Sequence, residues 1–89
     1  PRMTLGTEEE QKRIANRLRR AYGQLGGVIS AMESGADCRA IVTQLAAVSS
    51  ALDRAGFAII STAMRDCVLD GDDAELTVDE LEKLFLSLA

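Results

Sequence analysis

The 89-residue sequence has no histidine, no tryptophan, one proline, two cysteines and only 3% aromatic residues. Without histidine, no imidazole base is available to a nucleophilic serine or cysteine, and we expect no enzymatic activity. The sequence has no apolar run of about 18 residues and no signal-peptide pattern, so we expect a cytoplasmic protein without a membrane partner. In such a reducing compartment, two lone cysteines are more often reactive or metal-ligating than joined in a standing disulfide.

The residues that are abundant favour helices. Alanine, leucine and isoleucine are common, and no strand pattern is visible. We predict an all-α chain with one domain over 1–89 and helices at about 7–34, 38–68 and 78–88. Each predicted helix begins at a residue suited to N-capping: Thr7, Asp37 and Thr77.

Apolar residues recur at steps of three and four along the first two predicted helices. In the first helix they are Ile14, Leu18, Tyr22, Leu25, Ile29 and Met32. In the second they are Cys38, Ile41, Leu45, Val48, Leu52, Ala55 and Ile59. This second, coiled-coil-like stripe is too long for the short third helix to cover, and the chain is short for a self-sufficient core. We therefore predict an antiparallel four-helix-bundle dimer that assembles to a tetramer.

Cys38 and Cys67 are 29 residues apart, and 29 helical steps of about 100° come close to eight full turns. On one continuous helix both thiols would project from the same side, about 43 Å apart at a rise of about 1.5 Å per residue. They could not meet within one chain. Two such helices, antiparallel about a two-fold axis near Leu52 and Asp53, would place Cys38 opposite Cys67 of the partner. The alternative is that both cysteines are simply buried apolar residues.

Local electrostatics distinguish the two thiols. Cys38 follows Asp37 at a predicted helix N-terminus and precedes Arg39. The helix dipole and the cation both favour a thiolate there, although the charge of Asp37 opposes it. Cys67 stands at a predicted helix C-terminus beside Asp66, where the dipole disfavours negative charge. If the two thiols react as a pair, we predict that Cys38 is the nucleophile that attacks first. Cys67 would then be the second thiol, which resolves the product formed on Cys38.

Charge is segregated along the chain although the net charge is −4. Residues 11–65 carry eight basic and three acidic residues, whereas residues 66–89 carry eight acidic residues and one lysine. The segment 12–20 has five positive charges and no negative one, which makes it a candidate phosphate-binding face. A solvated helix face is the alternative meaning of such a run.

Three segments together carry a family resemblance: NRLRRAYGQLGGVISAMESGADC, QLAAVSSALDRAG and AMRDC. Over about residues 10–88, the chain resembles the copper-sensing and nickel-sensing repressor family (CsoR/RcnR). The resemblance implies an all-helical bacterial transcription factor that forms dimers and tetramers and binds operator DNA. In the copper branch, a histidine four residues before the second cysteine completes a three-coordinate copper(I) site. That position here is Ala63, which cannot ligate a metal.

The GADC segment, the region of Ser61 and the missing ligand histidine are similar to the persulfide-sensing branch (CstR). This similarity implies that Cys38 and Cys67 of different protomers become bridged by sulfur atoms, and that the repressor then releases its operator. Thiolate attack on sulfane sulfur gives a persulfide, which a second thiol can convert to a di- or polysulfide link that other thiols reverse. No cofactor is then expected. The alternative effector is copper(I), a soft ion that two thiolates can bind linearly.

By the same resemblance, Arg17 and Arg54 match arginines that contact DNA in the family. Supporting candidates are Lys12, Arg13 and Arg20. An ion pair is the alternative role for Arg54. No helix-turn-helix pattern is present, so we expect a flat basic surface that reads mainly DNA shape and phosphate register. A helical dimerisation module without DNA binding is the alternative for the whole chain.

Overall fold

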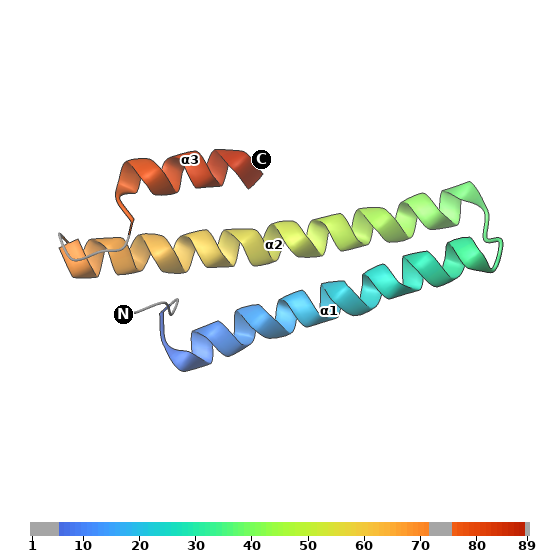
Figure 1. The fold of residues 1–89 in the computed structure, drawn as a ribbon, viewed down its shortest axis with the longest axis horizontal. Helices are drawn as coiled ribbons and strands as arrows, with labels where there is room; N and C mark the ends of the chain where they lie inside the picture. Colours follow the sequence, from blue (N-terminus) through green and yellow to red (C-terminus); the bar gives the residue numbers. More distant parts are fainter. Residues whose placement is uncertain (1–5, 72–75, 89) are drawn as a thin grey trace.

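The computed structural model describes residues 6–71 and 76–88, and these include three helices (Figure 1). The helices are α1 (Glu8–Glu33), α2 (Cys38–Asp70) and α3 (Val78–Leu88). No strand occurs within the described ranges, which confirms the predicted all-α protomer. The predicted domain, 1–89, also includes residues 1–5, 72–75 and 89, which lie outside the described residues.

The long helix α2 lies between the other two (Figure 1). α1 packs antiparallel along one side of α2, and α3 folds back along its C-terminal half. Among the described residues, α1 and α3 do not contact each other. None of these three helices combines the length and the apolarity that crossing a membrane requires.

Local hydrogen bonds fix where the helices begin and end. Thr7 and Glu10 form a reciprocal capping box, in which the Glu10 N–H donates to the Thr7 hydroxyl at 3.1 Å and the Thr7 N–H donates to the Glu10 carboxylate at 2.9 Å. α1 ends before Gly35, which adopts a left-handed conformation at φ 83°. Asp37 then accepts a hydrogen bond from the Ala40 N–H at 2.8 Å and begins α2. From there α2 continues for 33 residues, about 50 Å at a rise of about 1.5 Å per residue.

The seam between α1 and α2 is built from two buried rows at heptad spacing: Ile14, Ala21 and Val28 of α1 and Val48, Ala55 and Thr62 of α2. Ala31 of α1 is also buried, as is Gly56 of α2, which lies beneath α3. α3 adds Leu81, which is fully buried, and an aromatic contact between Phe57 and Phe85 with ring centroids 5.4 Å apart. Glycine at position 56 allows α3 to approach closely, because a Cβ there would lie 2.8 Å from a methyl carbon of Leu88.

Most of the predicted apolar stripe of α1 does not face α2. Ile14 is buried as expected, but the rest of that stripe is exposed: Leu18, Tyr22, Leu25, Ile29 and Met32. On α2, Leu45 and Leu52 are also about half exposed. The chain has a radius of gyration of 16.4 Å, against about 12 Å for a compact domain of this length. A single protomer therefore leaves much of its apolar surface available to a partner.

Candidate functional site

Both cysteines lie on α2, at its opposite ends. Cys38 is the first residue of the helix and is exposed, while Cys67 lies one turn before its C-terminal end and is partly buried. Both are free thiols. Since α2 is continuous between them, they lie about 43 Å apart and within about 20° of the same direction around the helix axis. The structure therefore does not bring the two predicted thiols together within one protomer.

The side of α2 that carries the thiols is open at one end and covered at the other. Leu45 and Leu52 share the side of Cys38, and both are about half exposed. Gly56 also lies on this side, where it is buried beneath α3. A partner can therefore reach Cys38 directly, but it has to approach Cys67 alongside α3.

Within the described residues, no third ligand accompanies either thiol. Ala63 is one helical turn before Cys67 and offers no donor atom. Among the described residues, no group of three or more histidine, cysteine, aspartate or glutamate side chains could hold a metal ion. A metal ion bound by both cysteines would need thiolates from two protomers, because α2 separates the two thiols of one chain.

The predicted DNA-contacting residues are all exposed: Lys12, Arg13, Arg17 and Arg20 on α1, and Arg54 on α2. Arg17, Arg20 and Arg54 line one shallow hollow between the two helices. Arg13 and Arg17 line a neighbouring hollow. Lys12 borders neither of these two hollows. We call Arg13, Arg17, Arg20 and Arg54 the basic edge.

Arg54 makes no ion pair with any residue in the described part of the chain, so this alternative role is not met within one protomer. The same is true of the other arginines of the basic edge. Their guanidinium groups are therefore available to an anionic partner.

The basic edge and the exposed leucines lie on opposite sides of the α1–α2 pair. On α1, Leu18 lies about 40° to one side of the buried Ile14 and Arg17 about 60° to the other side. On α2, Leu52 and Arg54 are two residues apart, a rotation of about 200°. We call Leu18, Leu25, Leu45 and Leu52 the apolar edge. Because Cys38 lies on the side of Leu52, the thiols and the basic edge face away from each other.

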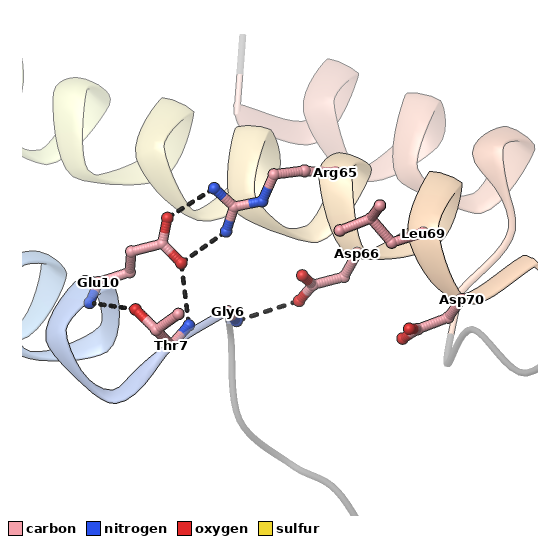
Figure 2. Close-up of a pocket in the computed structure, with 7 residues that line it drawn as sticks. All are labelled: Gly6, Thr7, Glu10, Arg65, Asp66, Leu69 and Asp70. Carbon is pink, nitrogen blue, oxygen red and sulfur yellow. Dashed lines mark hydrogen bonds and ion pairs between the residues drawn. The ribbon is translucent and has the colours of Figure 1, made fainter.

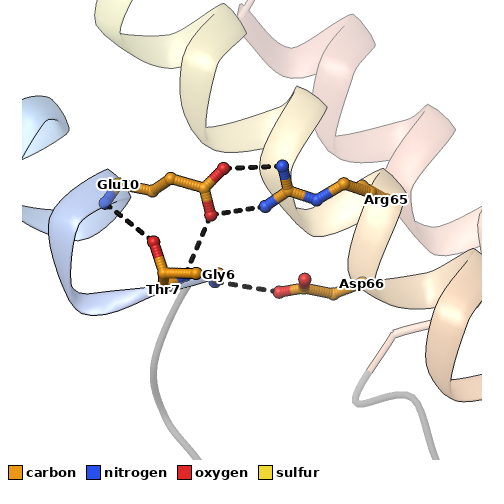
Figure 3. Close-up of polar contacts among 5 residues, drawn as sticks. All are labelled: Gly6, Thr7, Glu10, Arg65 and Asp66. Carbon is orange, nitrogen blue, oxygen red and sulfur yellow. Dashed lines mark hydrogen bonds and ion pairs between the residues drawn. The ribbon is translucent and has the colours of Figure 1, made fainter.

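A cluster of polar contacts ties the start of α1 to the last turns of α2 (Figures 2 and 3). The two terminal nitrogens of Arg65 donate to the two carboxylate oxygens of Glu10 at 2.6 and 2.5 Å. The Gly6 N–H donates to the Asp66 carboxylate at 3.0 Å. We call Gly6, Thr7, Glu10, Arg65 and Asp66 the N-terminal clamp; together with Leu69 and Asp70 they line a shallow pocket (Figure 2).

Apart from the capping role of Thr7, no sequence pattern predicted the N-terminal clamp. Its partners are 55 to 60 positions apart, a separation at which no local pattern can reveal a pairing. Gly6 is held at φ 65°, and a Cβ there would lie 2.7 Å from the Thr62 methyl carbon and 2.8 Å from a nitrogen of Arg65. Glycine is therefore needed for this close approach.

Residues 10–87 match the metal-sensitive transcriptional repressor family. The chain belongs to this family, CsoR/RcnR. Its members are repressors rather than enzymes, in agreement with the expectation from the missing histidine.

The chain is also similar to individual known proteins. It is 40% identical to the copper-sensing transcriptional repressor CsoR of Mycobacterium ulcerans (strain Agy99), over 81% of this chain and 65% of that protein. It is 44% identical to the uncharacterized protein YrkD of Bacillus subtilis (strain 168), over 62% of this chain and 94% of that protein. The chain thus spans just under two thirds of the length of the mycobacterial repressor. No significant match was found among solved structures.

The ion pair between Glu10 and Arg65 in the N-terminal clamp should make the stability of the fold depend on pH. The hydrogen bonds from Arg65 and from the Thr7 N–H lower the pKa of Glu10 from 4.5 to about 2. Because this pKa is lowered on folding, the pair contributes stability above pH 4.5, and the contribution is lost as the pH falls toward about 2. We expect an NMR titration of the Glu10 carboxyl to give a midpoint near 2 in the wild type and nearer 4.5 in Arg65→Gln.

The matched control for this titration is Arg39→Gln, which removes an arginine outside the clamp and should leave the midpoint of Glu10 unchanged. Equal midpoints in the wild type and Arg65→Gln would contradict the pairing.

Proposed function

We propose that this family member is a DNA-binding repressor that senses persulfides or polysulfides through Cys38 and the partner protomer's Cys67. The observation that carries the proposal is the pair of free thiols on one side of a continuous α2, with alanine at position 63. In a dimer with antiparallel α2 helices, a two-fold axis near the half-exposed Leu52 would bring each Cys38 opposite the Cys67 of the other protomer. Each dimer would then hold two equivalent sites.

The chemistry requires only two thiols and a donor of sulfane sulfur. The Cys38 thiolate attacks the outer sulfur of a persulfide, the sulfur–sulfur bond of the donor breaks, and the donor leaves as a thiolate. The Cys67 thiolate of the partner then attacks the Cys38 sulfur, and hydrosulfide leaves as a disulfide forms. If both cysteines carry a persulfide, the same displacement gives a trisulfide. Cellular thiols reverse either link.

The basic edge is the proposed surface for operator DNA. Its arginines are exposed and have no ion-pair partner in the described part of the chain, so they can reach phosphates without breaking an existing contact. Since none of the three described helices projects as a reading helix, we propose that phosphate register and DNA shape supply much of the specificity.

Assembly is part of the same proposal. The apolar edge is large for a single protomer to leave in water, and burial against a second copy would stabilise both chains. We propose a four-helix-bundle dimer, a tetramer of two dimers on DNA, and a cytoplasmic location in which the thiols stay reduced.

Copper(I) sensing is the second candidate function, favoured by the similarity to a copper-sensing repressor. Copper(I) is soft and accepts linear coordination by two thiolates, so the same Cys38 and Cys67 pair could hold it. Because Ala63 supplies no third ligand, we expect weaker binding than at a three-ligand site. Ala63→His should raise the affinity, since it places an imidazole one turn from Cys67 on the same side of α2.

The basic edge yields a prediction for DNA binding. Arg17→Ala and Arg54→Ala should each weaken binding to the promoter of the protein's own operon. Each should also flatten the dependence of log affinity on log salt by about 0.9 per lost phosphate contact. Fluorescence anisotropy across a salt series measures both quantities, with Arg39→Ala as the exposed control outside both hollows. Unchanged affinity in both variants would exclude this edge as the DNA surface.

The thiol pair yields a second prediction. Inorganic polysulfide should convert the wild type to a covalent dimer on non-reducing gels, add mass in whole sulfur atoms and release DNA, and dithiothreitol should restore binding. Cys38→Ser should abolish cross-linking and release, whereas Cys67→Ser should still accept sulfur at Cys38 without forming the link. If the wild type ignores polysulfide but leaves DNA on stoichiometric copper(I), the effector is copper(I).

A further inference from the structure

The N-terminal clamp lies between the two regions that the proposed function has to connect. Arg65 and Asp66 directly precede Cys67 on α2, and they bind Glu10 and Gly6 at the start of α1 (Figure 3). The sensing end of α2 is therefore fastened to the first turn of α1 through two consecutive residues.

From Glu10, the same helix leads straight to the basic edge. Arg13 and Arg17 follow Glu10 by three and seven residues, about one and two helical turns. Glu10 also borders the hollow that these two arginines line. A displacement of the first turn of α1 would therefore move Arg13 and Arg17 relative to Arg54 on α2.

The N-terminal clamp also connects two opposite sides of α2. Cys67 and Arg65 are two residues apart, which places them about 200° apart around α2. The thiol therefore faces the side on which a partner would dock, while Arg65 faces the side of the basic edge. The contact is well suited to transmit a movement, because a two-bond guanidinium–carboxylate pair fixes both distance and orientation.

We propose that Arg65 and Glu10 are positioning residues that couple the chemical state of Cys67 to the placement of Arg13 and Arg17. This inference rests on the proposed sensing role of Cys67. When Cys67 is bonded to the partner's thiol, the last turns of α2 shift toward that bond. The clamp carries the start of α1 with them, and the arginines on α1 lose their register with Arg54 and with the DNA phosphates.

The experiment compares operator affinity with and without effector, using inorganic polysulfide in one arm and copper(I) in the other. Glu10→Gln keeps an oxygen that can accept from the Thr7 N–H but removes the charge. Arg65→Gln removes the cation, and Arg65→Lys keeps a cation without the two-bond geometry. The matched control is Glu80→Gln, because Glu80 forms the same capping box with Thr77 at the start of α3 and has no ion pair among the described residues.

Coupling between two sites typically changes affinity by about 5- to 150-fold. We expect effector to weaken operator binding by a factor in that range in the wild type and in Glu80→Gln. In Glu10→Gln and Arg65→Gln the factor should approach one although Cys67 still reacts, and in Arg65→Lys it should be intermediate. A clamp that served only folding would change thermal stability and leave this factor unchanged.

The outcomes separate the two proposals. If effector weakened operator binding by the same factor in all variants, the coupling role would be overturned and the proposed function would stand. A wild type that neither effector releases would overturn both. Circular dichroism and sedimentation establish whether each variant folds and assembles. If a glutamine variant does not, Arg65→Lys decides. If effector weakens its operator binding by the same factor as in the wild type, the coupling role is overturned.

Discussion

The continuity of α2 determines how this protein can use its two cysteines. An unbroken helix from Cys38 to Asp70 holds its two cysteines on one side but about 43 Å apart, far beyond the reach of a sulfur–sulfur bond or a shared ion. Any chemistry that uses both thiols therefore needs a second chain. The same rigidity gives a second chain a defined register, because antiparallel pairing about the middle of α2 matches each end with the opposite end of the partner.

The α1–α2 pair has two opposite edges, the apolar edge and the basic edge, and we assign a different role to each. Small residues such as Ala21 and Ala55 fill the seam and bring the two helices close together. Bulky apolar side chains such as Leu52 are left on one edge, and arginines such as Arg17 and Arg54 on the other. A partner that covers the apolar edge leaves the basic edge open, so assembly and DNA binding need not compete for one surface. The cost of this separation is that a signal at the thiols must cross the helix pair, which is the role we assign to the clamp.

Much of the protomer follows from local rules that a sequence displays. Thr7, Asp37 and Thr77 are capping residues with a defined chemistry, and apolar steps of three and four identify the helices between them. The resemblance carried by the blocks around Cys38 and Cys67 led to the family that the comparison then showed. The sequence did not reveal which apolar row faces the protomer's own core. A row such as Leu18 and Leu25 has the same periodicity whether it packs on its own chain or on another. The Glu10–Arg65 pair was also out of reach, since it forms only once α1 and α2 lie antiparallel.

The intersubunit pairing of Cys38 with Cys67 can be tested by mixing Cys38→Ser and Cys67→Ser protomers and allowing them to exchange before polysulfide is added. A mixed dimer contains one intact pair, Cys38 of one protomer and Cys67 of the other, whereas a dimer of either variant alone contains none. We expect a covalent dimer in the mixture and in neither variant by itself. Cross-linking of either variant alone, or its absence from a mixture shown to have exchanged, would contradict the intersubunit site.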